Sequence, residues 1–118
     1  MEKDNIIRSK TFQFSLNIIE LYKQLISKQE FVISKQLLKS ATSIGANIRE
    51  AQAGQSKKDF LAKIYIAFKE ANETSYWLEL LEKSNFVGTN ISSFLAEIDE
   101  ILKILNKIIQ TTKINIEK

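Results

Sequence analysis

The chain has 118 residues, of which 44% are hydrophobic and 26% charged, the composition of an ordinary globular domain. Cysteine, histidine and proline are absent, which excludes disulfides, thiolate or imidazole metal sites, and reactions that need an imidazole base or a thiol nucleophile. The formal net charge is +3, a mild basic excess. We therefore expect one domain spanning residues 1–118, with no metal and no cofactor.

Few residues in the sequence interrupt regular structure, since there are only three glycines. Helices can therefore run long. Residues 1–10 lack the apolar segment of a secretory signal, and no apolar run approaches the ~18 residues that span a bilayer. We expect a cytoplasmic protein that makes no contact with a membrane.

The first expected helix covers about residues 10–27, and the second, after a short polar connection, covers 31–53. The apolar stripe of the first helix recurs at helical spacing: Phe14, Ile18, Leu21, Tyr22 and Leu25. The second helix has a similar stripe: Leu37, Ala41, Ile44, Ile48 and Ala51. Gly54 is expected to close the second helix in the left-handed conformation.

A third helix is expected over residues 57–84, because Ser56 stands three residues before Asp59 in a variant of the capping box. Its apolar face comprises Ile64, Ala67, Ala71, Thr74, Leu78 and Leu81. A fourth helix, capped by a residue within 89–92, is expected over 91–111. Its stripe comprises Ile91, Phe94, Ile98, Ile101, Leu105 and Ile108. Four helices joined by short connections predict an all-α, antiparallel, up-and-down four-helix bundle.

The third and fourth helices carry more apolar side chains than one bundle needs. The surplus lies beside the main stripes: Leu61, Tyr65, Phe68, Tyr76, Leu95, Leu102 and Ile109. Contiguous exposed patches of this kind mark interfaces, so we expect a ring-shaped homo-oligomer in which these residues meet a neighbouring copy. In the alternative, the two tyrosines cover the edge of a single bundle with their hydroxyls in water.

Asn47 places an amide within the apolar stripe of the second helix. A buried amide without hydrogen bonds costs ~1–3 kcal/mol, so we expect it to bond Glu70, Glu73 or Thr74 on the third helix. Such a pair would set the register of the two helices. Gly45, surrounded by small residues, predicts that another helix approaches closely at this point.

Glutamates are the only candidates for a metal centre: Glu50, Glu70, Glu73 and Glu97. Di-iron bundles need a Glu-x-x-His motif on each of two helices, and this chain has no histidine. Glycine-rich phosphate loops are also missing from the sequence. We therefore expect that the protein is not an enzyme.

Basic residues are concentrated in the first half of the sequence. Residues 1–58 carry ten basic and five acidic side chains, whereas residues 59–118 carry seven and nine. These cations either solvate helix faces or, repeated around a ring, form a surface that holds a polyanion such as RNA or DNA. The candidate phosphate contacts are Arg8, Lys10, Lys23, Lys28, Lys35, Lys39 and Arg49.

The segments SATSIGANIREAQAG and IAFKEANETSYWLELLEKS resemble the four-helix bundle family known from open reading frames within intervening sequences of 23S ribosomal RNA genes. The resemblance extends from about Ser9 to Ile109 and is most specific at residues 43–50 and 69–78. It implies a bacterial protein that forms antiparallel four-helix bundles and ring-shaped homopentamers. The family's activity is not established, but a related bundle, the accessory protein of diversity-generating retroelements, forms a similar pentamer and binds nucleic acid.

The sequence differs from the family pattern at two positions. Arg49 stands where the family often has a small residue, and Ala51 stands where it has a glycine.

From the charge distribution and the resemblance we expect a non-enzymatic homopentamer of this family that binds the backbone of RNA or DNA. The alternative is a protein-interaction scaffold whose lysines only keep it soluble. The salt dependence of nucleic-acid binding separates these two functions.

Overall fold

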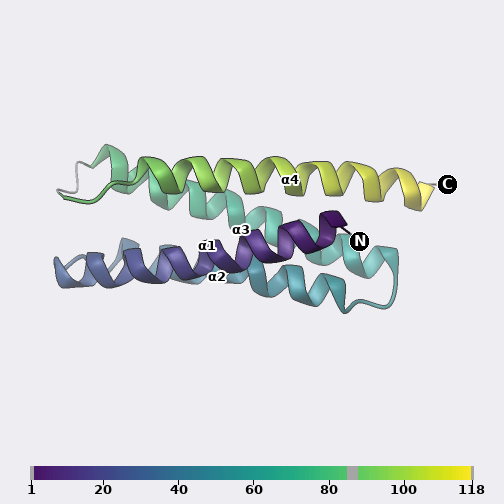
Figure 1. Cartoon of the computed structure of the whole chain (residues 1–118), viewed down its shortest axis with the longest axis horizontal. Helices are drawn as coiled ribbons and strands as arrows, with labels where there is room; N and C mark the ends of the chain where they lie inside the picture. The colour runs from purple at the N-terminus through teal and green to yellow at the C-terminus, as the bar shows by residue number, and fades with distance from the viewer. Residues whose placement is uncertain (1, 85–87, 118) are drawn as a thin grey trace.

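The computed structural model describes the backbone of residues 2–84 and 88–117, with side chains from Asn5 onward. It contains four helices, α1 (Glu2–Ser27), α2 (Ile33–Gln52), α3 (Lys57–Lys83) and α4 (Ser92–Glu117), and within these described ranges there is no strand. The helices run alternately up and down a body of 51 × 22 × 21 Å (Figure 1). The expected all-α class is confirmed. None of the four helices is both long and apolar enough to cross a membrane.

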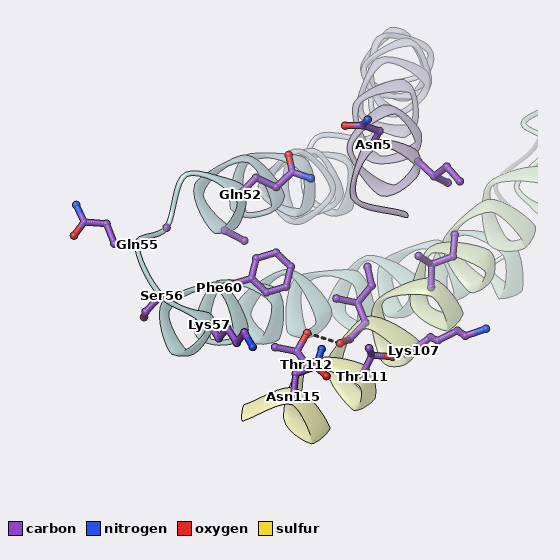
Figure 2. Close-up of a pocket in the computed structure, with 15 residues that line it drawn as sticks. Asn5, Gln52, Gln55, Ser56, Lys57, Phe60, Lys107, Thr111, Thr112 and Asn115 are labelled. Carbon is purple, nitrogen blue, oxygen red and sulfur yellow. Dashed lines mark hydrogen bonds between the residues drawn. The ribbon is translucent and has the colours of Figure 1, made fainter. Parts of the chain in front are cut away.

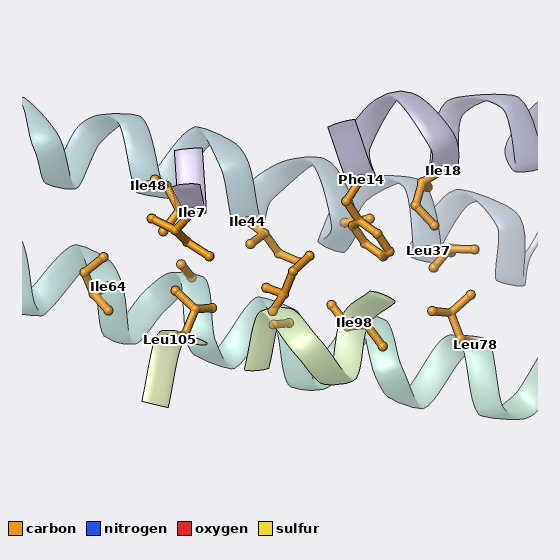
Figure 3. Close-up of a cluster of buried hydrophobic side chains, with 14 of the residues drawn as sticks. Ile7, Phe14, Ile18, Leu37, Ile44, Ile48, Ile64, Leu78, Ile98 and Leu105 are labelled. Atoms are coloured by element: carbon orange, nitrogen blue, oxygen red, sulfur yellow. The ribbon is translucent and has the colours of Figure 1, made fainter. Parts of the chain in front are cut away.

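Packing follows the order of the helices in the chain. The most extensive contact is between α2 and α3, while α1 packs on α2, α4 packs on α3, and α1 and α4 share the least contact. The predicted stripes meet in one core, to which every helix contributes (Figure 3): Ile7, Phe14, Ile18, Leu37, Ile44, Ile48, Ile64, Leu78, Ile98 and Leu105. Full burial of each such side chain contributes about 1.5–3 kcal/mol relative to exposure, so this core is the main source of stability.

Helices α1 and α4 are both longer than their apolar stripes predicted. The expected start of α1 at residue 10 is too late, because Ile7 and Thr11 are already buried and the Thr11 hydroxyl donates to the Ile7 carbonyl at 2.8 Å. Helix α4 runs six residues past the expected end at Thr111, and its Thr112 is buried. The apolar spacing did not predict the first turns of α1 and the last turns of α4, because these turns are mostly polar. A helix without proline or glycine continues readily through polar positions.

The expectation that Gly54 closes α2 in the left-handed conformation is wrong. Among the residues that the structure describes, Gly88 is the glycine with positive φ, at 84°. Helix α2 instead ends through Ala53, whose N–H donates to the Arg49 carbonyl at 3.1 Å. A Cβ on Gly54 would lie 3.1 Å from the Ala51 carbonyl oxygen, so the tight path of the turn, not its handedness, favours glycine there.

Side chains and backbone complete the other helix ends. The Ser56 hydroxyl accepts the Asp59 N–H at 3.0 Å, which confirms the predicted cap of α3. Gln29, with φ of 68°, follows α1 in the left-handed conformation, and the Glu30 N–H returns to the Leu25 carbonyl at 2.9 Å in a Schellman pattern. The Glu30 carboxylate then accepts the first two amides of α2, at 2.8 and 2.7 Å.

The polar contact between α2 and α3 is not the one expected. The Asn47 amide donates to the carbonyl and the hydroxyl of Ser43, at 2.9 and 3.0 Å, within its own helix. Its expected partners on α3 are wrong, because the i−4 neighbour satisfies the amide locally. Thr74 instead hydrogen-bonds Ser40 across the buried interface at 2.9 Å. The Gly45 prediction holds, because a Cβ there would lie 3.5 Å from the Thr11 carbonyl oxygen of α1.

The residues predicted to form an oligomer interface divide into three groups. Ile109 is only 3% exposed, so its assignment to an interface is wrong: it belongs to the core of the single chain. Tyr76 is exposed. The others are half-buried and pack against the core: Leu61, Tyr65, Phe68, Leu95 and Leu102. Large exposed apolar side chains also lie where the sequence did not place them, on α1 and the α1–α2 connection: Ile6, Phe12, Leu16, Phe31 and Val32.

Candidate nucleic-acid interface

The antiparallel arrangement gives the bundle two chemically different ends (Figure 1). We call the half containing residues 5–14, 43–70 and 105–117 the pocket end, and the half containing 15–42, 71–84 and 88–104 the closed end. Among the side chains that the structure describes, the pocket end carries nine basic and four acidic groups, whereas the closed end carries six and eight. Charge therefore separates along the bundle axis, because folding brings the basic C-terminal half of α4 beside the N-terminal half of α1.

The predicted phosphate contacts do not form one patch. Arg8, Lys10 and Arg49 lie at the pocket end, and the remaining four lie at the closed end: Lys23, Lys28, Lys35 and Lys39. Along α1 alone, Arg8 and Lys28 are about 30 Å apart at 1.5 Å per residue. A single phosphate group cannot contact both sets, so the two ends are separate candidate surfaces.

The two predicted arginines each contact the neighbouring helix, Arg8 from α1 and Arg49 from α2. Arg8 Nη1 donates to Gln52 Oε1 at 3.0 Å, and the Arg49 guanidinium carbon lies 5.1 Å from the centre of the Phe12 ring. Phe12 is half exposed and stands one turn after Arg8 on the same face of α1. These four residues, which we call the arginine cluster, present two cations that form no ion pair with a carboxylate among the described side chains.

Several predicted lysines already have partners. Lys10 forms an ion pair with Glu100 on α4 at 2.9 Å, and Lys23 forms one with Glu20 at 2.9 Å. Lys28 donates to the Thr89 hydroxyl at 3.1 Å. A carboxylate partner lowers the field that a lysine offers to a phosphate, so Lys10 and Lys23 are weaker contacts than the sequence predicted.

Sequence reasoning missed several basic residues that fold onto the pocket end, among them Lys57, Lys58, Lys107 and Lys113. The first two form a dipeptide at the start of α3, and Lys107 lines the pocket described below. Lys113 Nζ lies 5.7 Å from the centre of the Tyr65 ring. The antiparallel order of the helices, which the sequence did predict, was the signal that could have brought α4 into the basic surface.

A pocket of about 1090 Å³ opens at this end, between the α2–α3 turn and the C-terminal half of α4 (Figure 2). Phe60 points into it, and its apolar lining also includes Ile6, Ala51, Ile104 and Ile108. Polar residues line the rest: Asn5, Gln52, Gln55, Ser56, Lys57, Lys107, Thr111, Thr112 and Asn115. Gln52 is shared with the arginine cluster, so the two features are contiguous.

The glutamates considered for a metal centre do not converge. Glu50 pairs with Lys63 at 3.1 Å, Glu73 accepts Trp77 Nε1 at 3.1 Å, and Glu97 accepts Asn17 Nδ2 at 3.2 Å. Partial burial, with a smaller contribution from nearby Glu73, raises the pKa of Glu70. No group of three or more metal-ligating side chains occurs in the part of the chain that the structure describes.

Comparison with known proteins places this geometry in a family. A family model described as 23S rRNA-intervening sequence protein matches residues 3–107. A similar solved structure is the crystal structure of a protein with unknown function from the S23 ribosomal protein family of Bacteroides thetaiotaomicron VPI-5482. It is 49% identical, with a TM-score of 0.87, and the match covers 92% of this chain and 98% of that one. No curated protein matches the chain. The chain belongs to the 23S rRNA-intervening sequence protein family.

Proposed function

We propose that this protein is a non-enzymatic homopentameric bundle that binds the phosphate backbone of RNA or DNA through its pocket end. The observation that carries the proposal is the local excess of nine basic over four acidic side chains at that end. Arg8 and Arg49 extend this surface along α1 and α2. Guanidinium groups bind phosphate oxygens well because their planar donors match the phosphate geometry.

Assembly supports this function by repeating the basic surface. One copy presents a modest field, but five copies around a ring would place the pocket ends on one rim and multiply the positive potential there. The exposed Phe12 and Leu16 on α1 give the bundle an apolar face suited to contact between copies. The family name refers to intervening sequences of 23S rRNA, so RNA is the first ligand to test.

Light scattering, followed by titration of the same sample with a labelled RNA hairpin and a DNA duplex at two salt concentrations, tests the proposal. We expect a pentamer whose affinity for both ligands falls steeply with salt, because phosphate binding releases counterions. The Arg8→Gln/Arg49→Gln variant should reduce the slope of log affinity against log salt by about one for each lost contact. Lys35→Gln/Lys83→Gln, with the same charge change at the closed end, is the matched control.

A protein-interaction scaffold is the second candidate, favoured by the apolar α1–α2 connection. Phe31 is 61% exposed and Val32 75% exposed, so this connection offers a hydrophobic contact at the closed end. A pentamer that binds neither ligand at low salt would contradict nucleic-acid binding and leave the scaffold. A monomer would contradict the ring on which both functions rest.

A further inference from the structure

The pocket at the basic end has a lining that phosphate-backbone binding does not use. Its volume of about 1090 Å³ lies slightly above the usual range for small-molecule sites, about 300–1,000 Å³. The Phe60 ring points into the space between α2 and α4, with Ile104 and Ile108 among the lining residues of α4 (Figure 2). A flat aromatic group could therefore pack against an aromatic ring and aliphatic side chains there.

The polar part of the lining is rich in carboxamides and poor in acids. Four carboxamides contribute, Asn5, Gln52, Gln55 and Asn115, and none of the described residues that line the pocket is acidic. A carboxamide offers both a donor and an acceptor, which suits the edge of a nucleobase. Two lysines, Lys57 and Lys107, and no carboxylate occur among the described lining residues, so the lining itself carries a positive charge.

The start of α3 supplies the cationic side of the pocket. The Ser56 hydroxyl accepts the Asp59 N–H, and the Phe60 N–H donates to the Ser56 carbonyl at 3.0 Å. The N–H groups of Lys57 and Lys58 precede these bonds and belong to the open first turn of the helix, where the macrodipole favours an anion. In Figure 2 the Lys57 side chain lies toward Thr112, whereas Lys107 extends outward from the rim.

We propose that this pocket binds one unpaired nucleotide, with its base against Phe60 and its phosphate at Lys57 and the first turn of α3. Lys107, on the rim, contacts the next phosphate when the nucleotide is part of a strand. The inference rests on the proposed function in that its ligand is a unit of nucleic acid, but it adds a requirement for an accessible base. A free nucleotide and a nucleotide in a single strand share this chemistry.

A pocket for an unpaired base would distinguish single-stranded from double-stranded nucleic acid. A base inside a duplex is stacked on both faces and must be extruded, at a cost of a few kcal/mol, before it can enter a pocket. An unpaired base avoids that cost, while a single strand and a duplex offer the same kind of phosphate backbone. We therefore expect a single strand to bind at least tenfold more tightly than a duplex with the same number of phosphates.

Isothermal titration of the full chain with adenosine 5′-monophosphate, adenosine and ribose 5-phosphate tests the pocket directly. Adenosine 5′-monophosphate should bind at least tenfold more tightly than either fragment, because only it uses the apolar lining and the cations together. Equal affinity of adenosine 5′-monophosphate and ribose 5-phosphate would overturn the proposal, since the base would then contribute nothing. Titration with a single strand and the matched duplex separates binding of free nucleotides from binding within a strand.

Two variants locate the binding site. Thr111→Trp places a large side chain at an exposed position of the lining and should abolish nucleotide binding, while Ser93→Trp, also exposed on α4 but at the closed end, should leave it unchanged. Lys57→Gln should weaken nucleotide binding about tenfold, the usual loss for one charge-assisted hydrogen bond. Lys83→Gln, at the opposite end of α3, is its control. Circular dichroism confirms that each variant folds.

The outcomes distinguish this proposal from the proposed function. If single strand and duplex bind equally at low salt and Thr111→Trp changes neither, the pocket proposal is wrong and backbone binding stands. If neither the single strand nor the duplex binds at low salt, the proposed function is wrong. Weakened nucleotide binding by Ser93→Trp as much as by Thr111→Trp would also overturn the pocket as the site.

Discussion

The closed end and the pocket end of the bundle differ in charge, in packing and in the way their connections are made. At the closed end, Leu25 and Leu78 are completely buried, and Gln29 and Glu30 tie α1 to α2 through backbone and carboxylate bonds. At the pocket end, Ile108 lines an open pocket, and cations outnumber carboxylates. The core runs through both ends, but the closed end has the tighter connection, and the pocket end has the open pocket and the excess of cations.

The largest expected effect compares one core residue from each end. Leu78→Ala should lower the free energy of unfolding by about 3–5 kcal/mol, because the cavity it leaves is enclosed on all sides. Ile108→Ala should cost about 2 kcal/mol, since the space it leaves joins a pocket already open to water. Urea denaturation at one protein concentration measures both. Equal losses would show that the pocket end is packed as tightly as the closed end.

The carboxylate of Glu30 gives a second, smaller effect. Glu30→Ala removes two hydrogen bonds to the first amides of α2 and should destabilise the protein by about 1–2 kcal/mol. Glu20→Ala removes only a surface ion pair with Lys23, so it should cost less than about 0.5 kcal/mol. The melting temperatures of the two variants compare the stabilisation by the helix cap with that by the surface ion pair. A larger loss for Glu20→Ala would contradict the role of Glu30.

Gln29 should allow stabilisation of the closed end. Its φ of 68° is in the left-handed region, which a side chain disfavours and glycine tolerates. Gln29→Gly should therefore raise the free energy of unfolding by about 0.5–1 kcal/mol, measured by urea denaturation. Lys28→Gly, one residue earlier in the chain, should destabilise the protein, and stabilisation by both variants would show that strain at Gln29 is not the cause.

The smallest expected effect is the pH dependence that Glu70 contributes. Because burial raises its pKa in the folded state, the folded protein binds a proton more readily than the unfolded chain. This residue's contribution to stability therefore increases as the pH falls from neutral through the raised pKa. Glu70→Gln should stabilise the protein slightly at pH 7, where the carboxylate it replaces is charged, and should have no such effect well below pH 4.5. Melting temperatures at the two pH values, with Glu79→Gln as an exposed control, measure the difference.

Most of the fold could be predicted from the sequence because its apolar spacing is regular. The buried stripe of α3, from Ile64 to Leu81, and the cap at Ser56 appear in the structure where they were expected. Contacts that depend on which side chain is nearest could not be predicted in this way. Asn47 finds Ser43 within its own helix, and Thr74 finds Ser40, because local geometry decides between partners of similar chemistry.

The candidate site was harder to predict than the core. Counting charge along the sequence picked Arg8 and Arg49, which the structure places at the pocket end, but it did not pick Lys57 and Lys107, because the basic surface is assembled from residues far apart in the chain. The pocket has no motif at all, since its lining comes from the ends of four helices. The spacing of apolar residues along one helix indicates which of its side chains are buried, whereas the lining of a pocket between helices depends on how the helices are placed relative to one another.

The limited contact between α1 and α4 includes polar side chains that reach from one helix to the other. Lys10 contacts Glu100 at 2.9 Å and Asn17 contacts Glu97 at 3.2 Å. Lys28, directly after α1, contacts Thr89, shortly before α4, at 3.1 Å, whereas α2 and α3 pack together most extensively. Polar bridges of this kind yield to water at little cost, so backbone amides of α1 and α4 should exchange with deuterium through local openings. The backbone amides of the α2–α3 hairpin should exchange last, because they become exposed only when the whole molecule unfolds.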